Sequence, residues 1–133
     1  MAALDTNVLV RWIVDDDPKQ CASVARLLES AASRHERFFI TITVMLELEW
    51  VLRSRYRFDK ALVTAALDAL MTAAELDFQS EPALEQALWF FRQAGSPDFA
   101  DCLHVALVRQ AGQEPLLTFD RQASNLADAI LLD

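Results

Sequence analysis

Glycine, proline and cysteine are all scarce in this chain, and each shortage excludes a class of protein. Two glycines and four prolines in 133 residues leave no flexible linker, low-complexity tract or fibrous repeat. Two cysteines cannot build a disulfide framework, and neither lies in a Cys-x-x-Cys pair. We therefore expect a helix-rich folded protein with two free thiols and no zinc site.

The sequence also has no apolar run of the roughly 18 residues that a membrane-spanning helix needs. Its first residues carry no basic, apolar leader of the secretory type. These features predict a cytoplasmic protein without a membrane partner. Hydrophobic residues still make up 53% of the chain, and its length suits a single domain over residues 1–133.

Positive charge is also scarce, because the formal net charge is −8. Polyanion-binding proteins usually show clustered lysine and arginine, so the overall balance argues against a nucleic-acid partner. One short segment runs against this trend, with Arg53, Arg55, Arg57 and Lys60. Taken alone, the segment is best explained as a solvated helix end, where the helix dipole favours cations.

Short apolar runs typical of strands alternate with segments of helical periodicity. The runs predict strands near residues 2–5, 38–42, 76–78, 116–119 and 130–132, and the first, second and fourth of these are expected to be buried. Helices are expected between them, capped by Asp17, Thr43, Asp59, Ser80 and Asp98. This order predicts an α/β fold with a mainly parallel sheet, helices on both faces and a helical projection between the strands near 42 and 76.

Four acids lie where an apolar run meets a turn or a helix start: Asp5, Glu47, Asp101 and Asp120. Ligands of open parallel sheets bind outside the carboxyl ends of the strands, so we expect these acids to converge there. Converging carboxylates repel one another unless a cation lies between them. A set of oxygen ligands without cysteine or histidine indicates Mg²⁺ or Mn²⁺.

Each acid also has a local explanation that is compatible with this role. Asp5 can cap the helix that follows it, Glu47 can sit in a first helical turn, and Asp120 can form a turn. Asp98 and Asp101 are three residues apart at a helix start, which predicts that Asp98 is the cap and Asp101 the ligand.

Several neighbours of the acids receive narrower predictions. Three polar residues could donate hydrogen bonds to the carboxylates or to water, or could satisfy local backbone groups: Thr6, Asn7 and Thr118. Glu49 lies about 200° around the helix from Glu47 and is expected to be solvated. His104, alone on a largely apolar helix, is expected to be a core residue.

Four segments together resemble PIN-domain ribonucleases of the VapC toxin type: Leu4–Val10, Leu46–Leu52, Asp98–Leu103 and Thr118–Arg121. The resemblance covers essentially the whole chain. It implies a PIN-like three-layer α/β/α sandwich and an Mg²⁺- or Mn²⁺-dependent endoribonuclease that hydrolyses RNA phosphodiester bonds with metal-activated water. It also implies a homodimeric toxin that a VapB-type antitoxin neutralises.

The resemblance also implies roles for individual residues. Asp5 and Asp101 look like the principal metal ligands, Glu47 like a ligand acting directly or through water, and Asp120 like a fourth, more variable acid. Asp98 is then an accessory residue. The cationic segment gains an RNA-binding interpretation, which assigns flanking phosphates to Arg53, Arg55, Arg57 and Lys60.

Two other functions fit part of the sequence. Phosphatases and receiver domains also place aspartates and Mg²⁺ at strand ends, but Asp5-Thr6-Asn7 lacks the second aspartate of the phosphatase motif. No lysine follows a late strand as a receiver domain requires. A catalytically silent interaction module, whose acids merely cap helices, is the remaining alternative.

Overall fold

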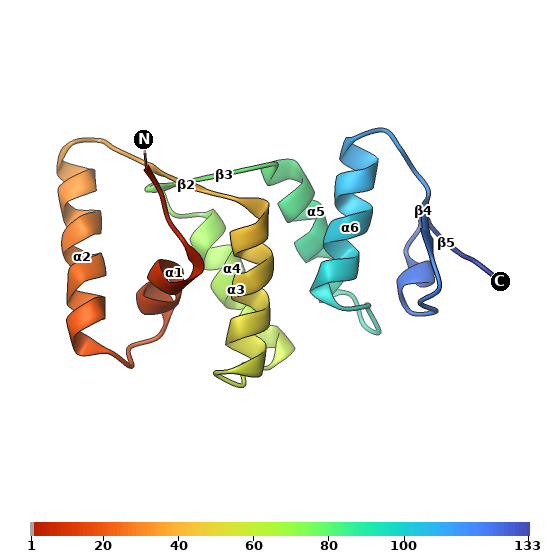
Figure 1. Ribbon diagram of the computed structural model, residues 1–133, viewed down its shortest axis with the longest axis horizontal. Coiled ribbons are helices and arrows are strands. Elements are labelled where there is room, and N and C mark those ends of the chain that lie inside the picture. The colour runs from red at the N-terminus through yellow and green to blue at the C-terminus, as the bar shows by residue number, and fades with distance from the viewer. Residues whose placement is uncertain (1) are drawn as a thin grey trace. The chain divides into compact units, whose positions relative to one another are not determined.

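The computed structural model describes residues 2–133, which form two compact units. Unit 1 extends to Gln79 and unit 2 covers Ser80–Asp133 (Figure 1). Every strand pairing in both units is parallel, and helices follow the strands, as the sequence predicts. The expectation of one domain over residues 1–133 stays a prediction.

Unit 1 is built on a three-stranded parallel sheet in the order β1-β2-β3. Its elements are β1 (Ala2–Ala3), α1 (Thr6–Ile13), α2 (Pro18–Ser33), β2 (Phe38–Ile40), α3 (Ile42–Ser54), α4 (Lys60–Met71) and β3 (Leu76–Phe78). Helix α1 packs between α2 and α3, and α4 packs on α3 (Figure 1). The start of α1 therefore lies close to α3, and this proximity positions the acids of unit 1.

Unit 2 is a helical pair followed by a small parallel sheet. It contains α5 (Glu81–Arg92), α6 (Phe99–Gln110), β4 (Leu116–Thr118), the short 3₁₀ helix η1 (Ala123–Asn125) and β5 (Ala129–Leu131). Helices α5 and α6 pack along each other, and β4 pairs with β5 in the register Leu117 to Ile130. From residue 2 to residue 133, none of the helices is long and apolar enough to cross a membrane.

Helix α3 shows how the helical period builds the core of unit 1. Met45, Leu48 and Leu52 recur three and four residues apart, and all three are fully buried. Ile40, at the end of β2, is buried as well. Burial of each large aliphatic side chain contributes about 2 kcal/mol relative to exposure. This packing holds α3 against its neighbours α1 and α4.

Of the three strands predicted to be buried, β2 is buried, but β1 is exposed and β4 is half-buried to exposed, so the prediction is wrong for these two. Ala2 and Ala3 of β1 are exposed, and Leu4 is the first buried residue of the run. In β4, Leu117 is 57% exposed, and Phe119 just after the strand is 78% exposed. The physical reason is that β1 lies at the edge of its sheet and β4 belongs to a sheet of two strands.

Helix α3 begins two residues earlier than expected, which corrects the predicted cap. The N-cap is Thr41, whose hydroxyl oxygen accepts the Val44 N–H at 3.3 Å, and Thr43 lies inside the helix. Strand β2 ends at Ile40, so Thr41 is the residue with the extended backbone that a cap needs. Glu47 consequently lies in the second turn of α3 and not in the first.

Glu49 is buried, which contradicts the expectation that it is solvated. Its side chain is only 2% exposed, and both of its carboxylate oxygens accept hydrogen bonds from the Arg53 guanidinium, at 2.8 and 3.3 Å. Glu47, on the other side of the helix, is exposed. The helical spacing separates the two acids as predicted, but Glu49 faces the protein interior, where Arg53 one turn later neutralises it.

We predict that Glu49→Gln destabilises the protein by about 2 kcal/mol, because a charge-assisted hydrogen-bonded pair with one buried partner is weakened. The measurement is urea unfolding followed by circular dichroism. Glu47→Gln is the matched control on the same helix, and its exposed position predicts a change below about 0.5 kcal/mol. Equal unfolding free energies for the two variants would show that the Glu49–Arg53 pair adds nothing to stability.

Candidate metal centre

Asp5 occupies the junction between β1 and α1, where it is both exposed and locally anchored. It is the N-cap of α1, and its Oδ1 accepts the backbone N–H groups of Asn7 at 3.0 Å and Val8 at 3.4 Å. Both capping hydrogen bonds are made to the same carboxylate oxygen. The capping role predicted for Asp5 is therefore confirmed, and it holds the carboxylate in a fixed direction at the end of the strand.

Glu47 is linked to the start of α1 by a side-chain hydrogen bond. The hydroxyl of Thr6 donates to Oε1 of Glu47 across 41 residues of sequence. Thr6 is buried, whereas Glu47 is exposed. The prediction that Thr6 donates to one of the site carboxylates is thus confirmed. Unit 1 therefore brings Glu47 to Thr6, the first residue of α1, which follows the cap residue Asp5 in the sequence.

Asp98 and Asp101 lie at the start of α6, in the positions that their spacing predicts. Asp98 is the N-cap residue, but its side chain makes no capping hydrogen bond. Asp101 lies in the first turn and is half-buried. The positions are confirmed, while the structural role proposed for the Asp98 carboxylate is not.

Asp120 follows β4 and is held by a local network. Its backbone N–H donates to the Thr118 hydroxyl at 2.9 Å, and its Oδ1 accepts the N–H of Ala123, the first residue of η1, at 2.9 Å. Thr118 therefore serves a local backbone group, one of the two roles open to it from sequence. The expectation that Asp120 forms a turn is also confirmed.

Gln122 is a residue of this site that the sequence does not reveal. Its side-chain amide donates to the carbonyl oxygens of Ser96 at 2.8 Å and Gly95 at 3.3 Å. These bonds tie the segment after β4 to the turn before α6, and so tie Asp120 to the region of Asp98 and Asp101. A glutamine in a polar loop carries no sequence signal for such a contact.

The acids of unit 2 interact electrostatically. Burial, followed by the negative charge of Asp120, raises the pKa of Asp101 above its ordinary value. Asp98 adds to the increase, while His104 opposes it. His104 is exposed, so the expectation that it is a core residue is wrong. It lies one turn after Asp101 on a helix whose apolar residues face α5.

The donors present suit a hard divalent cation chemically. Both units supply carboxylates at helix starts and strand ends, and like-charge repulsion at Asp101 is the situation that a cation relieves. Within either unit, taken over residues 2–133, three or more histidine, cysteine or acidic side chains do not gather closely enough to hold a metal. The convergence of Asp5, Glu47, Asp101 and Asp120 stays a prediction.

The predicted RNA-binding residues differ in their surroundings. Arg53 is bound to the buried Glu49, so its guanidinium is partly committed to the fold. Arg55, Arg57 and Lys60 are exposed in and after the loop between α3 and α4. The cationic segment therefore combines a structural arginine with exposed charges.

We predict that Asp101→Asn raises the melting temperature by roughly 1–3 °C at pH 7 in EDTA, because it removes a disfavoured charge. The raised pKa means that the wild-type charge is present only above that pKa. The advantage of the variant should therefore fade as the pH falls through it. Thermal unfolding between pH 4 and 8 tests this, with Glu29→Gln on α2 as the control; a pH-independent difference would contradict it.

The PIN domain family model matches residues 2–129 of the chain. No curated protein matches it. Among solved structures, the chain is similar to the crystal structure of Mycobacterium tuberculosis VapC20, described as a sarcin-ricin loop cleaving toxin. That similarity has 19% sequence identity and a TM-score of 0.43, and covers 96% of each chain. The family match extends over nearly the whole sequence and confirms the resemblance to PIN domains and the PIN-like α/β fold: the chain belongs to the PIN-domain family.

Proposed function

We propose that this protein is a metal-dependent endoribonuclease toxin of a toxin–antitoxin pair. The strongest support comes from the position and exposure of four acids in a chain that matches the PIN domain family model. Three of them lie where a strand ends or a helix begins, and Glu47 lies in the second turn of α3. All four are exposed or half-buried and so available to a ligand: Asp5, Glu47, Asp101 and Asp120. In a silent interaction module whose acids merely cap helices, the buried Thr6 would have no need to orient the carboxylate of Glu47.

In this proposal Mg²⁺ or Mn²⁺ is held by the four carboxylates, with Asp5 and Asp101 as the principal ligands. When bound, the cation supplies positive charge to the scissile phosphate and lowers the pKa of an attacking water molecule. The chain itself orients the carboxylates: the α1 backbone fixes Asp5, and Thr6 fixes Glu47. Neighbouring hydrogen bonds of this kind commonly set the affinity of a metal site.

The exposed cations of the segment 53–60 are proposed to bind flanking phosphates of the RNA. A chain of net charge −8 repels a polyanion on average, so local positive charge decides where RNA can approach. Arginine suits this task because its planar guanidinium can donate two parallel hydrogen bonds to a phosphate.

The proposed partners are a VapB-type antitoxin and a second copy of the chain, in the cytoplasm. Large apolar side chains on helix surfaces support the presence of partner surfaces, since Trp50 and Trp89 are each 58% exposed and Leu62 is 52% exposed. Light scattering of the purified chain, alone and with the product of an adjacent short reading frame, measures both associations.

We predict that Asp5→Asn and Asp101→Asn each lower the cleavage rate of RNA at least about a hundredfold, because each removes a principal ligand. The measurement is the Mg²⁺-dependent release of new RNA ends, with EDTA as a second means of abolishing it. Glu29→Gln, an exposed acid of α2, should retain wild-type rates. Full cleavage by a folded Asp101→Asn variant, or absence of cleavage in the wild type, would favour the silent interaction module.

The Thr6–Glu47 hydrogen bond gives a finer test. Thr6→Val keeps the shape of the buried side chain but removes the donor, so we predict about a tenfold loss of kcat/KM and a higher Mg²⁺ concentration at half-maximal rate. Thr6→Ser keeps the hydroxyl and should stay within about threefold of wild type. If both variants lose activity equally, packing at this position matters and the hydrogen bond does not.

A further inference from the structure

The loop between α3 and α4 presents two arginines on a short, strained backbone. Arg55 and Arg57 are exposed and flank Tyr56, which is half-buried. Arg57 has a φ of 56°, in the left-handed region that costs a residue with a Cβ roughly 1–2 kcal/mol. Anywhere within residues 2–133, neither of these guanidinium groups makes a hydrogen bond or an ion pair. The left-handed residue belongs to the turn that ends α3, in which the Phe58 N–H donates to the Leu52 carbonyl oxygen at 3.0 Å. This turn holds the two exposed charges close together after the helix.

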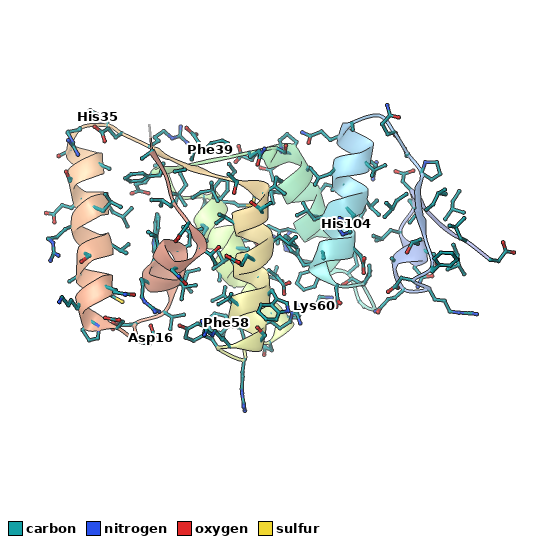
Figure 2. All side chains as sticks on the ribbon, in the orientation of Figure 1. Asp16, His35, Phe39, Phe58, Lys60 and His104 are labelled. Carbon is teal, nitrogen blue, oxygen red and sulfur yellow. The ribbon has the colours of Figure 1, made fainter. Side chains whose placement is uncertain are left out.

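Tyr56 fastens this loop to the rest of unit 1 through a closed ring of hydrogen bonds. Its hydroxyl donates to Oδ2 of Asp16 at 2.8 Å and accepts from the Arg11 guanidinium at 3.1 Å. The same Arg11 nitrogen donates to Oδ1 of Asp16 at 2.8 Å. Figure 2 shows Asp16, ahead of α2, at the same end of unit 1 as Phe58 of this loop. The ring therefore joins three separate segments of the chain.

Arg11 connects the loop to the helix that Asp5 caps. It lies on α1, six residues after Asp5, or roughly 9 Å along the helix axis. Its side chain is only 19% exposed, and its Nε donates to Gln20 at 2.6 Å. Because Asp16 neutralises Arg11 and Glu49 binds Arg53, these arginines serve the fold. The ring thus sets the loop in a defined position relative to the start of α1.

We propose that Arg55 and Arg57 bind backbone phosphates of the RNA, and that Tyr56, through Arg11 and Asp16, is the positioning residue that aims them. This inference rests on the proposed function and narrows its RNA contacts from a cationic segment to one loop. Tyr56 touches neither the RNA nor the reacting atoms. Its hydroxyl acts by fixing where the two flanking guanidinium groups lie.

The charge variants are tested by binding, in an Asp101→Asn background that leaves the RNA uncut. The probe is a fluorescein-labelled single-stranded RNA of mixed sequence with Mg²⁺, titrated over a series of salt concentrations and read by fluorescence anisotropy. Arg55→Ala and Arg57→Ala should each weaken binding about fivefold or more at low salt and reduce the salt slope by about one. Arg26→Ala, an exposed arginine of α2, is the charge-matched control and should stay within about twofold.

Tyr56→Phe tests the positioning role, because it keeps the ring and every charge and removes only the hydroxyl. In the active protein we expect KM for RNA to rise about threefold to tenfold while kcat stays within about twofold. Ser33→Ala, which removes a hydrogen bond of 2.8 Å at the far end of α2, should change neither. A rise in KM separates this role from a simple loss of stability. A loss of stability would lower the fraction of active protein, and so the apparent kcat, and would leave KM unchanged.

Clear outcomes would overturn the inference. Arg55→Ala and Arg57→Ala binding as tightly as the control, or Tyr56→Phe lowering kcat with KM unchanged, would remove the loop from RNA recognition. Absence of RNA binding by the Asp101→Asn protein would do the same. The proposed nuclease activity is tested separately. It would be contradicted if the Asp101→Asn protein cleaved RNA or if the wild-type protein did not. Binding lost only in the loop variants would support the inference even then.

Discussion

Parallel pairing between β1 and β2 is the constraint from which the unit 1 site takes its geometry. Ala3 lies opposite Phe39, and the Leu4 N–H continues the pairing by donating to the Phe39 carbonyl. Parallel strands end on the same rim of a sheet, so the helices that follow them begin side by side. The Thr6 hydroxyl consequently reaches Glu47, although 41 residues separate them.

Features that depend on neighbouring residues were predictable from the sequence. Asp17 before Pro18 and Asp59 before the next apolar period predict helix starts, and both residues cap the helices that follow. Each of these signals is satisfied within one turn of backbone. The alternation of helices with parallel strands follows from the same kind of local pattern.

Features that depend on where a strand ends, or on a contact between distant segments, were not predictable. Two threonines could cap α3, and only the end of β2 at Ile40 selects Thr41. The helical period separates Glu47 from Glu49, but period alone does not say which of them faces the interior. The hydrogen bonds from Gln122 to the turn before α6 join positions 26 and 27 residues apart, and no local sequence pattern predicts them.

The hydrogen-bonded ring of Tyr56, Arg11 and Asp16 also has a consequence for local unfolding. It joins α1, the α1–α2 connection and the α3–α4 loop, so none of these segments can open without giving up bonds made by the other two. Amide protons of the three segments should then exchange with solvent as one cooperative unit. The strained Arg57 backbone would be protected to the same degree as the ordered helix beside it.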